Sequence, residues 1–345
     1  MQSKRMRLIN NLKLFFIITV LLLICILFCG CIDVYERSPV NLIAISPDGS
    51  GLISIDHETV IQIWNITLCN ELHQFDWTKT AYITTGPIGV KWFPDNNRFS
   101  VMDSIHIRIF QISDFSEEWN SSGGFSYIDT SKEGGIFATS FGAWDLFNYS
   151  IITNYNISAF SSKISLSPNG RKLAYLPKSS NSLQIIDTLN NSIIQNFEST
   201  GQNITKISSC NALLWSEDEN RIAMVANYKN EMEKTYFYLW NSSEGSLIHK
   251  NNYSIRTGSA DLSPDGTRFI SGNLRDWNLT VINAFSGDAL FELFVSKRGV
   301  SSVDWSPDGS LIAAGSNDGI IKVWNATTGE LIQTMMTPKD HRVPT

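Results

Sequence analysis

Cysteine is scarce in this 345-residue chain. Three of its five cysteines, Cys25, Cys29 and Cys31, lie near the N-terminus, so only Cys69 and Cys210 remain for the rest. Small secreted domains that lack a sufficient core depend on several disulfides. This chain is 43% hydrophobic and long enough to bury a large core of its own. The composition therefore excludes a small disulfide-stabilised scaffold.

Basic runs are absent after residue 13, and the formal net charge is −6. Domains that bind nucleic acid usually carry a clustered basic patch. The sequence therefore predicts no nucleic-acid partner.

Catalytic and metal-binding motifs are also missing. The sequence has no strand–turn–helix nucleophile elbow, phosphate-binding loop or metalloprotease helix motif. Among five histidines, His57 and His106 fall near equivalent turns of adjacent repeats, without an accompanying cysteine or carboxylate set at ligand spacing. We therefore expect no enzyme activity, no catalytic residues, no metal site and no cofactor.

What the chain does contain is a repeated unit, seen best in "SPDGSLIAAGSNDGIIKVWNATTGE" (Ser306 to Glu330). In Ser-Pro-Asp-Gly, proline fixes φ, aspartate bonds back to the backbone, and glycine accepts a positive φ. Further turns at 317–319 and 328–329 separate alternating apolar runs, which predicts four antiparallel strands in this unit. A lone four-stranded sheet cannot bury both faces, so further copies are expected.

Seven copies follow one another along the chain. Their turn marks begin at Ser46, Phe93, Ser131, Ser167, Ser216, Ser263 and Ser306. Third strands follow as "IQIWN", "IRIF", "WDLFN", "LQIID", "FYLWN", "LTVIN" and "IKVWN". A period of about 43 residues is that of propeller blades. The prediction is an all-β fold, a seven-bladed β-propeller of four-stranded antiparallel blades over residues 40–337. Because blades one and seven each own four strands, we expect closure by packing and not by a borrowed N-terminal strand.

These repeats resemble those of WD-repeat proteins, with Trp-Asn where that family usually has Trp-Asp. The Gly-His pair that the family places before the first strand is absent from every unit. Ser316, Asp318 and Trp324 of the last unit match three positions of the family's buried His-Ser-Asp-Trp set. The resemblance implies a protein-interaction scaffold. It also implies that partners bind the rim carrying the second-to-third-strand loops and the connections between blades.

Two loops on that rim are distinctive: "NYKNEMEK" (Asn227 to Lys234) and "LRDWN" (Leu274 to Asn278). They belong to adjacent blades, so they can form one patch, and aromatic and arginine residues dominate interface energetics. The alternative is that Trp277 folds onto its own blade and that the insertion is a solvated loop. The candidate binding residues are Tyr228, Lys229, Lys234, Arg275 and Trp277.

The N-terminus is a basic start followed by "LFFIITVLLLICILF" (Leu14 to Phe28). This pattern is typical of a secretory signal, and Cys31 after Gly30 resembles a lipoprotein processing and lipidation site. The alternative is an uncleaved signal anchor over Leu14 to Ile32, which is long enough to span a bilayer. Both hypotheses place the propeller at the outer, extracytoplasmic face of the cell membrane. The predicted domains are 1–31 (leader or anchor), 32–39 (linker), 40–337 (propeller) and 338–345 (tail).

Glycosylation sequons are frequent, with ten Asn-X-Ser/Thr sites. If used, they imply passage through a glycosylating secretory route. A bias toward polar turn residues is the alternative explanation. Five lie at turns between third and fourth strands and are the candidate sites: Asn65, Asn148, Asn190, Asn241 and Asn325.

One position of each first strand is expected to face the central channel. It is occupied by Ala44, Lys91, Asp129, Ser165, Leu214, Asp261 and Asp304. Three carboxylates and a lysine suit a cation or polar ligand. The favoured alternative is structural, because a charge facing a neighbouring blade needs a backbone or hydroxyl partner. The tryptophans of first strands (Trp92, Trp215, Trp305) and third strands (Trp64, Trp240, Trp324) are interpreted as blade-to-blade packing.

The function predicted from these features is a membrane-anchored, extracytoplasmic WD-repeat scaffold with a protein partner of unknown identity. Two alternatives stay open. One is a propeller enzyme of the hydrolase or quinone-dependent dehydrogenase type, and the other is a purely structural envelope component.

Overall fold

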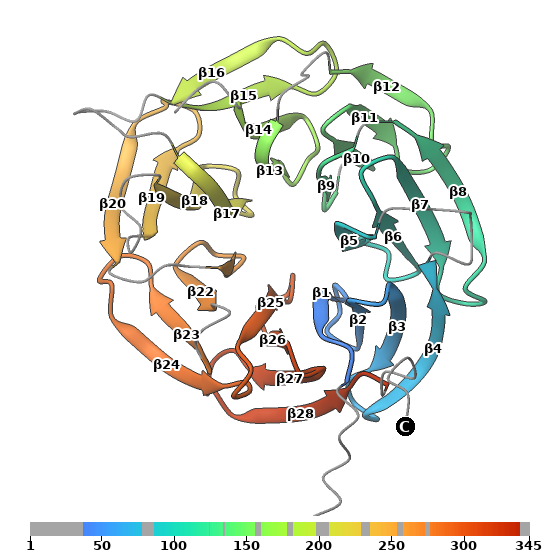
Figure 1. The fold of residues 1–345 in the computed structure, drawn as a ribbon. Helices are drawn as coiled ribbons and strands as arrows, with labels where there is room; N and C mark the ends of the chain where they lie inside the picture. Colours follow the sequence, from blue (N-terminus) through green and yellow to red (C-terminus); the bar gives the residue numbers. More distant parts are fainter. Residues whose placement is uncertain are drawn as a thin grey trace, which may run out of the picture. The chain divides into compact units, whose positions relative to one another are not determined.

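The computed structural model describes residues 37–77, 86–123, 125–133, 135–155, 160–177, 182–197, 207–228, 235–253, 258–272 and 277–338. Residues 38–338 form one compact unit. Within it, seven four-stranded antiparallel sheets surround a central opening (Figure 1). The predicted all-β, seven-bladed propeller is confirmed.

The first four blades use consecutive strands of the chain, with the first strand of each blade innermost (Figure 1). Their bounds are β1 (Val40–Ile45), β2 (Gly51–Asp56), β3 (Val60–Asn65), β4 (Asn70–Asp76); β5 (Gly89–Trp92), β6 (Arg98–Met102), β7 (His106–Gln111), β8 (Glu117–Ser122); β9 (Ile128–Thr130), β10 (Ile136–Thr139), β11 (Gly142–Asp145), β12 (Ile151–Asn154); and β13 (Phe160–Leu166), β14 (Lys172–Pro177), β15 (Leu183–Asp187), β16 (Ile193–Phe197).

The last three blades follow the same order. Their bounds are β17 (Ile207–Trp215), β18 (Arg221–Tyr228), β19 (Thr235–Asn241), β20 (Leu247–Tyr253); β21 (Ser259–Leu262), β22 (Arg268–Gly272), β23 (Asn278–Asn283), β24 (Ala289–Phe294); and β25 (Val300–Trp305), β26 (Leu311–Ser316), β27 (Ile320–Asn325), β28 (Leu331–Met336).

Each turn between a first and a second strand is built as its sequence suggests. In blade seven, the Ser306 hydroxyl donates to Asp308 and accepts from the Leu311 N–H at 2.8 Å, and Gly309 has φ +79°. In blade two, Asn96 takes the positive φ (56°) that glycine takes elsewhere. The turn therefore forms in blade two although asparagine replaces the glycine.

The third strand of blade three ends earlier than "WDLFN" suggested. β11 stops at Asp145, whose carboxylate accepts the N–H groups of Phe147 and Asn148. Those two residues therefore belong to the turn, and Trp144-Asp145 stands where other blades have Trp-Asn. The sequence pattern placed the end of this strand three residues too late.

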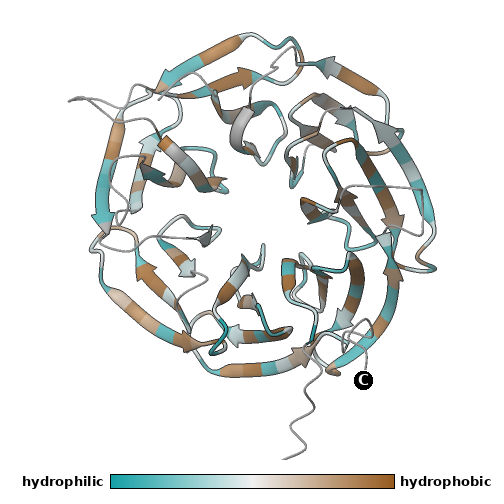
Figure 2. Ribbon diagram, viewed as in Figure 1, coloured by the Kyte–Doolittle hydropathy of each residue, from teal (hydrophilic) through white to brown (hydrophobic). Residues whose placement is uncertain are grey.

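The core is divided among the blade boundaries. The described residues form seven hydrophobic clusters, one between each pair of neighbouring blades. Hydrophobic stretches alternate with hydrophilic ones along the blades (Figure 2). All six tryptophans assigned to packing are buried, which confirms that prediction: Trp64, Trp92, Trp215, Trp240, Trp305 and Trp324.

Closure of the ring uses the same contacts as an ordinary blade boundary. Between blades six and seven, a Cβ added at Gly272 would lie 3.0 Å from Val300 Cβ. Between blades seven and one, a Cβ added at Gly315 would lie 2.8 Å from Val40 Cβ. Blades one and seven each contain four strands of their own segment. The expectation of closure by packing, without a borrowed strand, is confirmed.

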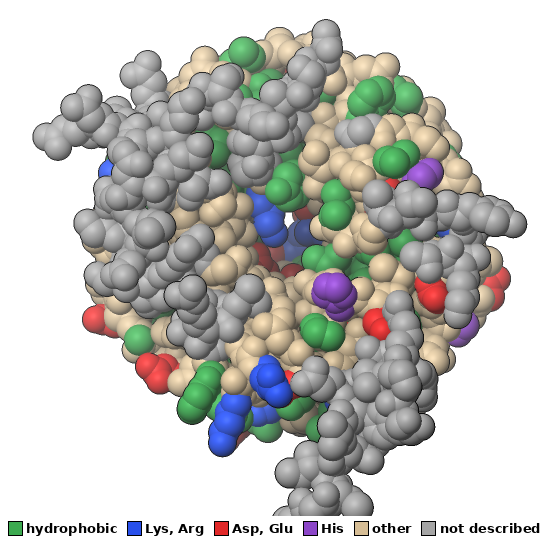
Figure 3. Space-filling model, viewed as in Figure 1, with side chains coloured by type: hydrophobic (Ala, Val, Ile, Leu, Met, Phe, Trp, Pro, Cys, Tyr) green, Lys and Arg blue, Asp and Glu red, His purple; other side chains and the backbone are tan. Residues whose placement is uncertain are grey.

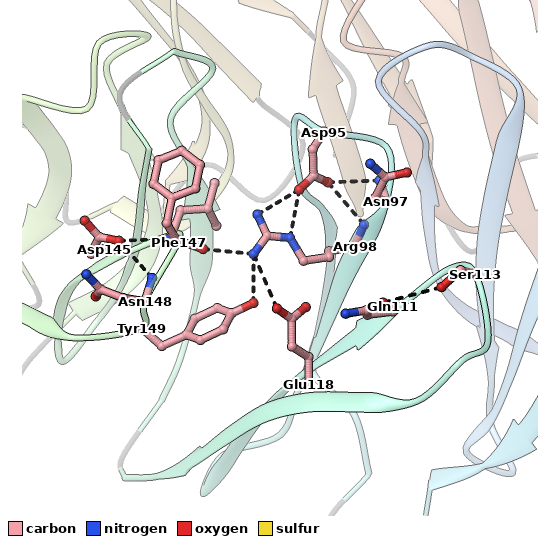
Figure 4. Close-up of polar contacts among 11 residues, drawn as sticks. Asp95, Asn97, Arg98, Gln111, Ser113, Glu118, Asp145, Phe147, Asn148 and Tyr149 are labelled. Carbon is pink, nitrogen blue, oxygen red and sulfur yellow. Dashed lines mark hydrogen bonds and ion pairs between the residues drawn. The ribbon is translucent and has the colours of Figure 1, made fainter.

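Arginine side chains add polar links between blades. Arg98, at the start of β6, bonds to Asp95 of its own turn at 2.7 Å (Figure 4). Its Nη1 reaches blade three, where it donates to the Leu146 carbonyl at 2.9 Å and to the Tyr149 hydroxyl at 2.8 Å. Arg268 repeats the link from blade six to the Ala326 carbonyl of blade seven. These links fix neighbouring blades to each other beyond their apolar contact.

Candidate functional site

The central channel is lined by the first strands of the seven blades, and both basic and acidic side chains gather around its opening (Figure 3). Two of the expected channel residues form an ion pair across a blade boundary. Lys91 Nζ lies 2.9 Å from Asp129 Oδ1. The structure therefore brings together charges that the sequence assigned to the same level of the ring.

All three channel aspartates are bonded to the backbone of the next blade. Asp129 Oδ2 accepts the Leu166 N–H at 2.8 Å, and Asp261 Oδ2 accepts the Trp305 N–H at 2.8 Å. At the closing boundary, Asp304 Oδ2 accepts the Ile45 N–H at 2.7 Å. These contacts support a structural role for the three carboxylates and not a role in binding a ligand.

Other members of the set contribute through their main chain or by packing. The carbonyls of Ala44 and Ser165 each accept an indole N–H from the next blade, from Trp92 and Trp215 respectively, at 3.0 Å. Leu214 packs against the hydrophobic cluster between blades five and six. The contacts at this level of the ring therefore join neighbouring blades, which supports the structural role that the sequence favoured over a ligand site.

The electrostatics of the channel follow from these contacts. Burial, together with the neighbouring Asp261 charge, raises the pKa of Asp304 to about 8. Burial also raises the pKa of Asp261. The Asp129 carboxylate raises the pKa of Lys91, which keeps this lysine protonated. These groups can share protons and hold blades together, but a lysine held in its charged form is not a nucleophile.

Cys69 and Cys210 are free thiols. Burial raises the pKa of Cys210 to about 12, so it is not a reactive thiolate.

The histidine pair noticed in the sequence does not converge on a metal site. His106 Nδ1 lies 3.3 Å from Asp103 Oδ2, and Asp103 Oδ1 closes the same turn by accepting the Ile105 N–H at 2.7 Å. His57 is exposed in the corresponding turn of blade one. Within the described ranges, no group of three or more His, Cys, Asp or Glu side chains is arranged to hold a metal ion.

The family's polar set is partly rebuilt in blade seven. The Ser316 hydroxyl donates to Asp318 Oδ1 at 2.5 Å, as the resemblance suggests. A second donor is Ser296, in the connection before β25, which bonds Asp318 Oδ2 at 2.5 Å. Sequence reasoning missed Ser296, because nothing marks a serine in a connection as a substitute for histidine.

Trp277 of the predicted rim patch is 54% exposed, which contradicts the alternative that it folds onto its own blade. Its carbonyl accepts the Val295 N–H at 2.9 Å, so the main chain is fixed while the ring faces solvent. Tyr228 ends β18, but its side chain lies outside the described part of the structure. Lys229, Lys234 and Arg275 also lie outside it. The patch as a whole stays a prediction.

The candidate glycosylation sites lie at the ends of third strands or in the turns that follow them. Asn148 and Asn190 are exposed, and Asn65, Asn241 and Asn325 are partly exposed. In the last three, the amide oxygen accepts N–H groups of the turn, as Asn325 does from Thr327 at 2.8 Å. Glycosylation of these residues stays a prediction.

A feature that sequence reasoning did not anticipate lies where the turns between first and second strands meet. Turns of blades five, six and seven line an open cavity of about 430 Å³ at the surface. Its charged lining consists of Glu217, Asp218, Arg221, Asp265, Arg268 and Asp308. No single repeat contains this cavity, so its signal is only the recurrence of Asp and Arg in turns of neighbouring blades.

The described portion contains no helix that could cross a membrane. Cys31 and the whole of Leu14 to Ile32 lie outside that portion.

Comparison with known proteins supports the resemblance to WD-repeat proteins. Residues 289–325 match the family model described as "WD domain, G-beta repeat". Similar proteins include Protein tipD of Dictyostelium discoideum (33% identical, over 28% of this chain and 17% of tipD) and WD repeat-containing protein 1 of Mus musculus (22%, over 35% and 27%). Protein SOF1 of Saccharomyces cerevisiae is 24% identical over 65% of this chain and 45% of SOF1.

The chain thus covers less than half of each of these relatives. Taken with the fold, the comparisons show a seven-bladed propeller that carries a WD40 repeat and is similar to WD-repeat proteins.

Proposed function

We propose that this protein is a protein-interaction scaffold that presents its loop faces to a partner. The observation that carries the proposal is the use of the channel charges. Asp129, Asp261 and Asp304 each bond the backbone of the next blade, so the acidic groups of the channel hold blades together. A rigid ring with exposed loops lowers the entropy cost of docking.

The proposal includes membrane attachment at the outer face of the cell. It is supported by the basic start and the apolar run Leu14 to Phe28, followed by Cys31. The lipid anchor is the version we favour over the signal anchor. The mass of the mature N-terminus separates the two. Lipidation of Cys31 is accompanied by cleavage before it, which removes residues 1–30, whereas a signal anchor retains them.

The partner-binding rim is tested by the double variant Arg275→Ala with Trp277→Ala. An exposed indole adds little to folding, so we expect an unchanged melting temperature. Loss of a central aromatic and an arginine from an interface typically costs more than about 2 kcal/mol of binding, or more than roughly 30-fold in affinity. Affinity capture with full-length protein is the measurement.

A matched control is Leu290→Ala, since Leu290 is also half-exposed but lies near the other end of β24 from Trp277. Undiminished capture by the Arg275/Trp277 variant would exclude this patch as the site. So would equal loss of capture by the Leu290 variant.

A further inference from the structure

The described chain enters the propeller at the rim that carries the loops between second and third strands. The Pro39 carbonyl accepts the N–H of His57, from the loop after β2, at 2.8 Å. The Ser38 carbonyl accepts the hydroxyl of Thr337, just beyond β28, at 2.8 Å. Both contacts precede β1, the innermost strand of blade one (Figure 1). The chain therefore joins this rim close to the central channel and not at the outer edge of the ring.

The proposed membrane anchor lies a short way before this point. Six residues, 32–37, separate Cys31 from Ser38, and a signal anchor that ends at Ile32 shortens the connection by one residue. An extended chain covers at most about 3.6 Å per residue, so Cys31 and Ser38 can be no more than roughly 25 Å apart. A tether of this length, joined near the axis of the ring, holds this rim toward the bilayer. The candidate glycosylation sites, such as Asn325 at the end of β27, lie at the opposite end of the strands.

Exposed apolar side chains in the loops of this rim are concentrated in blades two and three. They are Ile88 before β5, Ile105 between β6 and β7, and Phe141 between β10 and β11, with exposed fractions of 46, 45 and 45%. Figure 3 shows hydrophobic side chains on this face over blades two and three. Trp277 belongs to blade six, on the other side of the ring (Figure 1). Blades two and three therefore form a separate apolar sector of the rim.

Contacts between loops join the side chains of blades two and three into one surface. The connection between the two blades runs past both loops: the Gly123 N–H donates to the Ile105 carbonyl at 2.7 Å, and the Phe125 N–H donates to the Ser104 carbonyl at 3.2 Å. The rings of Phe125 and Phe141 meet edge to face, with centroids 6.4 Å apart. Because Phe125 is buried, it supports Phe141 from within the protein. Exposed patches of this kind on a folded protein mark sites of protein or membrane contact.

The charge of this surface is compatible with lipid. In the described loop segments 103–105, 125–127 and 140–141, the one carboxylate is Asp103, which is fully buried. It accepts the Ile105 N–H at 2.7 Å and thus closes its own turn. An exposed carboxylate would be repelled by anionic headgroups, whereas apolar side chains at an interface gain from leaving water. The loops therefore present apolar groups without exposed acidic ones.

We propose that these loops of blades two and three, with Ile88, Ile105 and Phe141, lie in the headgroup region of the bilayer that holds the N-terminus. The inference rests on the proposed membrane attachment and adds the orientation of the propeller on that membrane. A single lipid chain binds a membrane reversibly, and a second contact makes the attachment stable. A ring that meets the bilayer through blades two and three keeps the Trp277 loops, across the ring, available to a protein partner.

The test uses full-length protein in vesicles of phosphatidylcholine and phosphatidylglycerol that also contain a phospholipid with a photoreactive diazirine in its headgroup. After illumination, mass spectrometry identifies the labelled peptides. We expect label on the peptides that contain Ile105 and Phe141. Phe147 is the internal reference, because it is 77% exposed but lies in the turn after β11, at the opposite end of blade three. Its peptide should carry no label above that of protein illuminated without vesicles.

The double variant Ile105→Ser with Phe141→Ser separates insertion of the side chains from the effect of the tether. Loss of two apolar side chains from an interface should lower the labelling of these loops by at least about tenfold, while the protein stays with the vesicles. Phe147→Ser is the matched control, since it removes an exposed apolar side chain from the opposite face of the same blade. It should leave the labelling unchanged. Cooperative thermal unfolding checks that each variant is folded.

Three results would overturn the proposal. The first is labelling of the wild-type Phe147 peptide as strong as that of the Ile105 peptide. The second is undiminished labelling of the double variant, which would show that the tether alone brings this rim close to lipid. The third is loss of partner capture by the double variant with undiminished labelling, which would assign these side chains to a protein partner.

Failure of the proposed function gives different results. If the membrane attachment is wrong, alkaline carbonate releases the full-length protein from the vesicles and no loop is labelled, which overturns the attachment and the orientation together. If the scaffold function alone is wrong, the labelling pattern is as expected but no protein partner is retained at constant ratio.

Discussion

Asp304 experiences opposing influences on its protonation. Burial and the nearby Asp261 charge raise its pKa to about 8, while the Ile45 N–H and two lysines favour the ionised form. The carboxylate nevertheless holds blade seven to blade one through the Ile45 bond. The closing boundary therefore contains a group whose charge state changes near neutral pH.

The sign of the effect follows from proton binding in the folded and unfolded chains. An unfolded aspartate loses its proton near pH 3.8, whereas folded Asp304 retains it up to about pH 8. Folded protein thus binds more protons across this window, and stability falls as the pH rises through it. The destabilisation is complete above pH 8 and absent below the unfolded pKa.

Asp304→Asn removes this titration and keeps an oxygen for the Ile45 N–H. We expect the variant to gain stability relative to wild type between pH 4.5 and 8.5, by about 1 kcal/mol or more, the free energy of one pKa unit. Urea unfolding midpoints at the two pH values measure it. A difference between variant and wild type that does not change with pH would contradict the assignment.

At single residues, the sequence predicts local hydrogen bonds but not contacts between blades. The Ser-Pro-Asp-Gly turns were predictable because the bonds that close them lie within six residues, as with Ser306, Asp308 and Leu311. The partner of Asp304 lies 259 positions away, at Ile45. A buried charge is costly without a partner, so the sequence could predict that Asp304 accepts a hydrogen bond. It could not predict that Ile45 is the donor, because no local pattern specifies contacts between blades.

At the level of strands, the closing boundary depends on a close approach between β26 and β1. Gly315 faces Val40, which is fully buried, and an added Cβ would lie 2.8 Å from Val40 Cβ. Gly315→Ala should therefore destabilise the protein by about 1–3 kcal/mol, the usual cost of overpacking. Val40→Ala removes Cγ1, the atom nearest to an added Cβ, but keeps its own Cβ, so it should relieve part of the clash. The double variant should therefore be more stable than the sum of the two single changes predicts.

Gly266→Ala is the matched control for this cycle. Gly266 has φ +67° with no atom near the position of an added Cβ, so its substitution costs only backbone strain, about 1–2 kcal/mol. That cost should be independent of Val40. If Gly315→Ala shows no coupling to Val40→Ala in denaturant unfolding, the ring does not close through this contact.

Strand boundaries mark another limit of sequence reasoning. The third strand of blade three ends at the Trp-Asp pair 144–145, whereas the hydrophobic pattern of the sequence predicts that it continues to Asn148. The apolar Leu146 and Phe147 extend the hydrophobic run past the strand end. Asp145 ends the strand by capping the turn, a side-chain role that periodicity alone does not reveal.

At the scale of the whole molecule, the period of the repeats was sufficient to predict the fold. A sheet that exposes two apolar faces must be covered on both sides, and seven copies of such a sheet close on themselves. The seven clusters between blades are the result. The surface cavity of blades five to seven was harder to predict, because it is made by turns from three separate repeats.

The proposed function of the whole propeller is to bind a protein partner and not to catalyse the reaction of a small molecule. The most direct test is to purify the full-length chain from its native source and measure the ratio of bound protein across successive purification steps. We predict one partner at constant ratio, which the Arg275/Trp277 double variant loses without loss of folding. A wild-type chain that retains no protein at constant ratio, while turning over a small-molecule substrate, would contradict the account.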